Sequence, residues 1–330
     1  MLTKSRAAQL VTMGKRACIW LFDLLKDLQN LERVRNEIRL KGLKGATGTQ
    51  ASYLTLMKGD AAKVYQLEEK FCEKAGFSGA YPIAGQTSSR KVDTEIVTAL
   101  ASLGSSFHKI FTDIRLLCAF HEIGEPFGTD QIGSSAMPYK QNPARSERCC
   151  GIARHLMTIC GDTFATHSVQ WLERTLDDSS NKRLVMPEAF LCADAILQAA
   201  QFVFEGMGVN EKIVEKRLND EIHNLISEEI LVAMNENGAD RQTCHEELRK
   251  LSLAAGARVR DDPNLKNDLL DRIRAEKFFA PIHGKLDELV NAKRLVGLAP
   301  NQVERFIAND VKPVLDRYSA NLTVNALSVV

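Results

Sequence analysis

The longest regular apolar pattern of this sequence lies in the stretch Ile96-Val-Thr-Ala-Leu-Ala-Ser-Leu-Gly-Ser-Ser-Phe-His-Lys-Ile-Phe-Thr-Asp-Ile-Arg-Leu-Leu117. Its large apolar residues recur at alternating steps of four and three, at Ile96, Leu100, Leu103, Phe107, Ile110, Ile114 and Leu117. That spacing places them on one stripe of an α-helix and is typical of helical bundles. Because so long a stripe must be covered by other helices, the stretch predicts a bundle of long helices.

Four other stretches show the same helical period, and none shows strand-like alternation long enough to compete with it. Steps of three and four between leucine, valine and isoleucine mark a long helix near the start of the chain. Pro143 suits the first turn of another helix, since a proline there loses no needed hydrogen bond, and Pro187 either kinks a later helix or marks its start. The expected helices cover residues 7–40, 61–75, 143–160 and 184–204. We therefore predict an all-α fold.

The pattern changes after the segment Gly206 to Val209. Beyond it the predicted helices are shorter and are separated by breakers such as Gly238 and Pro281. We therefore predict a central helical-bundle domain over residues 1–209 and a small helical C-terminal domain over residues 210–330.

Composition gives little reason to expect nucleic acid or a membrane as partner. The formal net charge is +1, so anion binding must come from a local cluster. The longest apolar run, Ala17 to Leu25, contains Asp23 and is too short to span a bilayer. The eight cysteines form no CxxC pair, which predicts buried, reduced thiols and a cytoplasmic protein. No histidine has a second ligand at metal spacing, so we expect no metal site, and nothing in the sequence indicates another cofactor.

Three polar segments interrupt the helical pattern, at residues 80–90, 124–148 and 173–183. They are rich in cations and neutral hydrogen-bond donors, which suits a substrate carrying carboxylates or a phosphate, because a guanidinium pairs with either group through two hydrogen bonds. The alternative is that these charges are solvated helix ends. The candidate residues are Gln86, Ser134, Ser135, Lys140, Asn142, Arg148, Arg174, Ser179 and Arg183.

Ser134 and Lys140 lie in one glycine-containing loop. A serine is a poor base at its own pKa, so proton removal by Ser134 requires cations and backbone amides that stabilise its alkoxide, and Lys140 and the loop are placed to supply them. The alternative is that the serines cap the next helix while Lys140 is solvated. Spacing alone leaves both interpretations open.

The loop sequence Gly133-Ser-Ser-Ala-Met-Pro-Tyr-Lys-Gln-Asn-Pro143 resembles the signature loop of the fumarase and aspartase superfamily, whose members eliminate fumarate from a substituted succinate. Within that superfamily, Arg145-Ser-Glu-Arg148, Gly48-Thr-Gln-Ala51, Gly85-Gln-Thr87 and above all Gln170-Trp-Leu-Glu-Arg-Thr-Leu-Asp-Asp-Ser-Ser-Asn181 resemble the adenylosuccinate lyase family of animal type. The likeness runs along nearly the whole chain.

The resemblance implies a homotetramer whose active sites are shared between subunits, and a small-molecule substrate, a succinyl-purine nucleotide. Fumarate would be eliminated from adenylosuccinate, giving AMP, and from the succinyl-carboxamide ribotide of purine synthesis. Ser134 would be the base that takes the proton from the succinyl carbon next to the one bearing nitrogen. Lys140 and Asn142 would hold the succinyl carboxylates and stabilise the aci-carboxylate intermediate, with Glu147 orienting Lys140. The rest of the substrate would be bound by Gln86, Arg148, Arg174, Ser179 and Arg183.

The start of the chain departs from the family pattern. In the family a histidine in a Thr-His-x-Gln-Pro-Ala-Gln segment protonates the leaving nitrogen, and Lys4 holds its position here. The likeness begins only at Ala8-Gln9, so we expect a truncated form or an alternative start. Lysine is a weaker general acid than histidine at neutral pH, and we therefore expect greatly reduced or absent activity of this chain alone.

Two alternative functions follow from the same observations. The chain could be a non-catalytic assembly partner that joins others through its bundle helices, because the stripe of residues 96–117 would leave apolar surface exposed in a monomer. It could also be a sister lyase acting on argininosuccinate or malate, although the stretch Trp171 to Asn181 argues against that.

Overall fold

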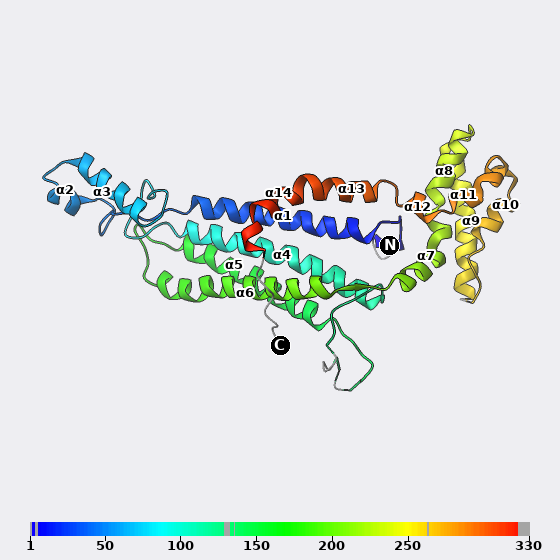
Figure 1. Cartoon of the computed structure of the whole chain (residues 1–330), viewed down its shortest axis with the longest axis horizontal. Coiled ribbons are helices and arrows are strands. Elements are labelled where there is room, and N and C mark those ends of the chain that lie inside the picture. Colours follow the sequence, from blue (N-terminus) through cyan, green and yellow to red (C-terminus); the bar gives the residue numbers. More distant parts are fainter. Residues whose placement is uncertain (1, 4–5, 129–132, 135, 263, 323–330) are drawn as a thin grey trace. The chain divides into compact units, whose positions relative to one another are not determined.

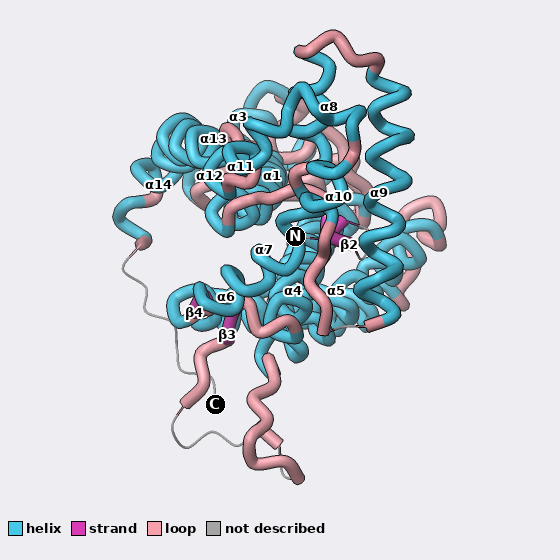
Figure 2. Tube along the Cα trace, turned by 90° about the vertical axis from the view of Figure 1, so that its right-hand side faces the viewer, coloured by secondary structure: helices cyan, strands magenta, loops and turns pink. Residues whose placement is uncertain are grey.

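Helices dominate the chain, and the predicted all-α fold is confirmed (Figures 1 and 2). The structure is a computed structural model that describes residues 2–3, 6–128, 133–134, 136–262 and 264–322. Within these ranges, strand occurs only as two-residue pieces: β1 (Leu2–Thr3), β2 (Arg6–Ala7), β3 (Ile123–Gly124) and β4 (Gly208–Val209). The long helices are α1 (Met13–Glu37), α4 (Lys91–Ala119), α5 (Ala144–Ser168) and α6 (Asp178–Gly206).

The other helices are shorter. Two lie between α1 and α4, namely α2 (Ala51–Leu56) and α3 (Ala61–Lys74). After β4 come α7 (Glu211–Leu225), α8 (Ser227–Glu236), α9 (Arg241–Asp261), α10 (Leu269–Ala275), α11 (Leu286–Leu289), α12 (Ala292–Leu295), α13 (Ala299–Phe306) and α14 (Lys312–Arg317). Turns of other pitch are the 3-10 segments η1 (Lys277–Lys285) and η3 (Ser319–Asn321) and the π-helical η2 (Ile307–Val311).

Contacts divide the described residues into two compact units. One holds those of the segments 1–19 and 209–323, and the other holds those of 20–208. The described residues that precede Trp20 therefore belong with the segment after residue 208, and β2 contacts α7 there. The predicted domain boundary at residue 209 stays a prediction.

The core of the larger unit is the packing of α4 against α5 and α6, which run side by side (Figure 1). The predicted stripe supplies α4's share of this core: Phe107, Ile110 and Ile114 are buried. Small residues on the facing helices, among them Ala153 of α5 and Ala189 of α6, are buried opposite them. Since small side chains let helix axes approach closely, this composition explains a tight three-helix contact.

The stripe on α4 is thus covered within the chain, so the argument that it would be exposed in a monomer is wrong. Exposed apolar side chains lie on the outer side of α6 instead: Leu184, Phe190, Leu191, Leu197 and Phe204. Among the described residues, α6 is also the one helix whose length and hydropathy would suffice to cross a membrane. A core helix of a bundle meets the same criteria, and α6 buries its other side against α5.

Several helix boundaries differ from the prediction. The first helix spans Met13–Glu37 instead of residues 7–40, and two later boundaries also move. The helix that begins after Pro143 continues past Cys160 and Gly161 to Ser168, because Cys160 and Thr163 are buried and packing outweighs the low helix propensity of glycine. The segment predicted as polar loop up to residue 183 becomes helical at Asp178, and Pro187 lies inside α6. At these two later boundaries, near Cys160 and at Asp178, tertiary contacts and not local helix propensity determine where the helix ends or begins.

The C-terminal part has a core of its own. Apolar side chains of α8, α9, α10, η1 and α11 converge there, and several are fully buried, including Ile230, Ile273, Phe279 and Leu286. These elements all follow residue 210, and the small C-terminal domain predicted over residues 210–330 stays a prediction.

The α2–α3 excursion, residues 41–79, leaves the bundle through a narrow stem. Leu40 donates its N–H to the carbonyl of Gly79 and accepts from the N–H of Tyr81, at 3.2 and 2.8 Å. Behind the stem, Lys44 Nζ lies 2.6 Å from Glu68 Oε2, and their side chains are only 7% and 11% exposed. Gln50 completes the clamp by donating from Nε2 to Glu68 Oε1, 3.3 Å away. This buried ion pair fastens the loop 41–50 to α3.

Candidate active site

The predicted site residues fall into two groups at opposite ends of the α4–α5 hairpin (Figure 1). At one end the start of α4 meets the end of α5, where the Thr94 hydroxyl donates to the carbonyl of Thr163 at 3.3 Å. At the other end the chain leaves α4 and re-enters at α5 through the signature loop. A helix of 29 residues at a rise of 1.5 Å per residue separates the ends by about 40 Å. One chain therefore does not bring the two groups together.

The signature-loop group contains the proposed base. The Ser134 hydroxyl oxygen accepts a hydrogen bond from the Met137 N–H at 3.2 Å, and Asn142 Nδ2 donates to the carbonyl of Gly133 at 3.2 Å. A Cβ on Gly133 would collide with the carbonyl oxygen of Lys140, so this turn requires glycine. The loop thus folds back on itself, with Ser134 at the turn.

The charged side chains of this group point to solvent. Lys140, Glu147 and Arg148 are exposed. Within the described part of the chain, neither the Lys140 ammonium nor the Glu147 carboxylate contacts an oppositely charged group. The predicted orienting role of Glu147 stays a prediction. Ser135, and Lys4 at the family's histidine position, lie outside the described residues.

Glu125, which sequence reasoning missed, closes the base of the loop. Its carboxylate accepts from the backbone N–H groups of Arg145 and Ser146 at 3.1 and 2.8 Å, and from the Ser146 hydroxyl at 2.7 Å. These are first-turn N–H groups of α5 that no helical carbonyl can reach, and a negative charge is favourable there. This cap could not be recognised from the sequence, because Glu125 lies twenty residues before Arg145, whose N–H it accepts.

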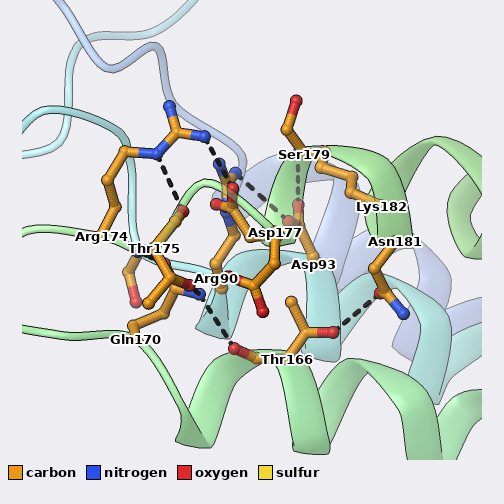
Figure 3. A network of polar contacts seen from close by, with 12 residues as sticks. Arg90, Asp93, Thr166, Gln170, Arg174, Thr175, Asp177, Ser179, Asn181 and Lys182 are labelled. Carbon is orange, nitrogen blue, oxygen red and sulfur yellow. Dashed lines mark hydrogen bonds and ion pairs between the residues drawn. The ribbon is translucent and has the colours of Figure 1, made fainter.

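The second group is organised by buried ion pairs around Asp178. Figure 3 labels the other members of this network: Arg90, Asp93, Arg174 and Lys182. One carboxylate oxygen accepts from Arg90 Nε and the other from Arg174 Nη2, both at 2.6 Å. Arg90 also lies 3.5 Å from Asp93, which accepts from Lys182 at 2.8 Å. Three cations and two anions therefore alternate along one chain of contacts.

Burial and charge act against each other at Asp178, whose side chain is 0% exposed. Burial by itself raises the pKa of this carboxyl, but the hydrogen bonds from Arg90 and Arg174 outweigh it and hold the pKa below its ordinary value of 3.8. Asp178 is therefore a carboxylate at neutral pH, and it keeps both guanidinium groups in place.

The other predicted residues of this end lie around the network. Arg183 Nη1 donates to the Ser179 carbonyl at 2.8 Å and contacts the Ser179 hydroxyl. Gln86 is exposed on the loop before α4. That loop is supported from behind, because a Cβ on Gly48 would collide with the carbonyl oxygen of Ala84. The structure thus brings Gln86, Arg174, Ser179 and Arg183 to the same end of the bundle.

A pocket opens between the loop 83–90 and the end of α5, with a volume of about 260 Å³. Its lining is mixed: Arg90 and His167 are beside Gln170, Glu173 and backbone of the loop. Gln170 is held by hydrogen bonds from its Nε2 to the Thr166 carbonyl and the Thr175 hydroxyl, each 3.1 Å. The cationic network and the pocket are therefore adjacent.

Arg90, Asp93, Asp178 and Lys182 were not chosen from the sequence, although Arg90 ends the polar segment 80–90 and both Asp178 and Lys182 lie in the polar segment 173–183. The pairing of Arg90 with Asp178 joins positions 88 residues apart, and no local pattern encodes that. Among the described residues, no three His, Cys, Asp or Glu side chains converge as metal ligands. All eight cysteines are free thiols; Cys72, Cys149, Cys150, Cys160 and Cys244 are buried and the other three half-buried.

Comparison with known proteins agrees with this architecture. A lyase family model matches residues 2–158, and a model of the adenylosuccinate lyase C-terminus matches residues 224–306. In fold, the chain is similar to 3-carboxy-cis,cis-muconate lactonizing enzyme from Pseudomonas putida, with a TM-score of 0.77, 22% identity, and 93% of this chain and 66% of that chain covered. It is similar to a fumarate lyase from Mesorhizobium sp. BNC1 with a TM-score of 0.76 and 21% identity, over 94% and 66% of the two chains.

Sequence relatives identify the family. The chain is 50% identical to the adenylosuccinate lyase of Schistosoma mansoni, covering 98% of this chain and 68% of the relative, and 46% identical to that of Schizosaccharomyces pombe, covering 97% and 66%. It thus spans about two thirds of the length of these relatives. The matches do not favour the alternative of a sister lyase. On this identity and coverage, together with the matching lyase models, the chain belongs to the adenylosuccinate lyase family.

Proposed function

We propose that this chain acts in the elimination of fumarate from a succinyl-purine nucleotide, with adenylosuccinate giving AMP as the main reaction and the succinyl-carboxamide ribotide as second substrate. The observation that carries the proposal is membership of the adenylosuccinate lyase family. The structure supports it with an exposed serine loop and with a cationic network beside a pocket, which suit a polyanionic substrate.

The two groups of residues take different tasks. Ser134 removes the proton from the succinyl carbon next to the one bearing nitrogen, and the electron pair moves to the adjacent carboxylate as the aci form. Lys140 and Asn142 hold the carboxylates and stabilise that charge, with Glu147 orienting Lys140. The aci form then collapses to fumarate as the C–N bond breaks, and the leaving nitrogen takes a proton from the general acid, whose position in the family is held here by Lys4. Gln86, Arg148, Arg174, Ser179 and Arg183 bind the rest of the substrate.

A complete site requires more than one copy of the chain. Because the base and the Arg174 network lie about 40 Å apart along α4, a substrate that contacts both must lie between different copies. A homotetramer with antiparallel bundle helices meets this requirement, and the exposed apolar side of α6, with Phe190 and Leu191, supplies a surface for helix packing. With reduced thiols and a metabolite as substrate, we place the protein in the cytoplasm.

The function is tested by fumarate release. Purified chain is incubated with adenylosuccinate, and fumarate and AMP are quantified by chromatography, with a Ser134→Ala variant as control. Because a lysine as general acid slows the reaction, we expect a low rate of fumarate release from the unmodified chain. In the Ser134→Ala variant the rate should fall to background. Fumarate released at the same rate by the two proteins would contradict the proposal, because Ser134 would then not be the base.

A further inference from the structure

The chain of ion pairs around Asp178 presents cations outward and keeps its anions inside. From one end to the other it runs Arg174, Asp178, Arg90, Asp93 and Lys182. The exposed fractions of these side chains are 19%, 0%, 10%, 13% and 38%. Both ends of this series of ion pairs, Arg174 and Lys182, are therefore cationic, and they have the largest exposed fractions in it. Figure 3 labels both residues. Arg174 and Lys182 are therefore the members of this network that are most open to an anionic ligand, whereas the Asp178 side chain is fully buried.

Arg174 is held by two fixed contacts. Its Nη2 donates to Asp178 Oδ1 at 2.6 Å, and its Nε donates to the Thr175 carbonyl at 3.2 Å. Within the part of the chain that the structure describes, Nη1 of Arg174 has no hydrogen-bond acceptor. The same guanidinium borders a second depression, lined by Val169, Trp171 and Thr175. Two corners of the planar group are thus fixed, and the third is left for a ligand.

We propose that Asp178 is a positioning residue, which holds Arg174 so that its free Nη1 faces an anionic group of the substrate. Arg90 acts as the anchor, since it occupies the other carboxylate oxygen and stops Asp178 from turning toward solvent. This inference rests on the proposed function for the identity of the ligand. The anionic group is a phosphate or a carboxylate, and the experiment separates the two.

The sign of one substitution distinguishes positioning from simple electrostatics. Asp178→Asn keeps the shape of the side chain but removes a negative charge beside the site. If the charge alone mattered, an anionic ligand would bind more tightly to this variant, because the net positive charge rises. If Asp178 positions Arg174, the anion binds more weakly, because the amide offers one acceptor oxygen where the carboxylate offers two. Either Arg174 or its anchor Arg90 then loses its hydrogen bond, and Arg174 is no longer held in a fixed orientation.

Binding is measured by calorimetry with AMP, adenosine and succinate as probes of the full-length chain. In the Asp178→Asn variant we expect the Kd to rise about tenfold, the effect of losing one hydrogen bond between charged groups. A rise for AMP but not adenosine assigns the phosphate, and a rise for succinate assigns a carboxylate. Asp194→Asn is the matched control: it removes a charge from an exposed position of the same helix, outside the network, and it leaves anion binding unchanged.

Arg174→Lys serves where the Asp178 variant fails to fold. It keeps the positive charge at a partly exposed position but loses the planar guanidinium group. Positioning therefore predicts weaker anion binding in this variant, whereas a pure charge effect predicts no change in anion binding. Unchanged or tighter binding in Asp178→Asn, or unchanged binding in Arg174→Lys, overturns the inference. Fumarate release by the unmodified chain is measured in parallel. Turnover with unaltered binding in the variants refutes the positioning role alone. Altered binding together with equal fumarate release by the unmodified chain and by Ser134→Ala refutes the proposed function alone.

Discussion

The buried pair Lys44–Glu68 permits a sharp prediction, because the same substitution can be made at an exposed pair of the same chain. Glu68→Gln replaces a carboxylate 2.6 Å from Lys44 Nζ by a neutral amide of equal size. The Lys44 ammonium, 7% exposed, then lacks both water and a counter-charge. Gln50, which donates to Glu68, also loses a charged acceptor. We expect the loop 41–50 to lose its attachment to α3.

The expected cost is large for one substitution. Removing one partner of a buried ion pair destabilises a protein by about 3–5 kcal/mol, since the remaining charge is left uncompensated. At the exposed pair Arg33–Glu37, where both side chains are more than half exposed, Glu37→Gln should cost less than about 1 kcal/mol. Because the excursion 41–79 is joined to the bundle by a narrow stem at Leu40, much of the loss should appear as local opening.

Native-state hydrogen exchange with mass spectrometry measures that opening, and urea unfolding measures the global change. Glu68→Gln should speed exchange in residues 41–79 first, while Glu37→Gln leaves it unchanged. The loop 81–90 should follow, because Gly48 packs against the carbonyl of Ala84. Equal, small effects of the two substitutions would refute the reasoning, since they would mean that the Lys44 ammonium finds water or another acceptor.

Three further predictions concern single residues. Glu125→Ala should lower the unfolding free energy by about 1–2 kcal/mol through loss of a charged helix cap; a variant with an unchanged melting temperature would show that the α5 N–H groups are satisfied otherwise. Asp178 has a lowered pKa, so its contribution to stability is present above its unfolded pKa of about 3.9 and is lost as the pH falls through the lower folded value. Acid titrations should therefore show a smaller loss of stability in Asp178→Asn than in the unmodified chain. Identical acid transitions of the two proteins would contradict this. Burial, with a smaller effect of neighbouring Cys150, raises the pKa of Cys149 to about 12, so iodoacetamide at pH 8 should leave Cys149 unmodified until denaturant is added; peptide mapping detects early alkylation, which would disprove its burial.

The sequence pattern predicted the bundle well, because the apolar stripe from Ile96 to Leu117 depends only on spacing along one helix. It predicted the helix boundaries near Cys160 and Asp178 less well. There, burial of Thr163 and the ion pair between Arg90 and Asp178 extend the helices. Neither contact is visible locally, since each joins residues distant in sequence.

The candidate site shows the same limit. Residue chemistry grouped the polar segments as one site, and the family likeness implied that such a site is shared between subunits, but neither indicated which segments meet within one chain. The length of α4 separates Ser134 and Arg174 within the chain, and a separation in space cannot be seen in a list of polar residues. Glu125 and Asp178 went unnoticed for a related reason: each acts on groups far along the chain.

The central proposal, that an active site combines the serine loop of one copy with the arginine network of another, is tested most directly by mixing two inactive variants. Ser134→Ala and Arg174→Gln chains are purified, denatured together and refolded, and fumarate release from adenylosuccinate is compared with that of each variant refolded alone. We predict activity in the mixture, because some sites then receive an intact serine loop and an intact arginine network from different copies. A mixture no more active than either variant, under conditions where the unmodified chain regains its activity on refolding, would contradict the proposal.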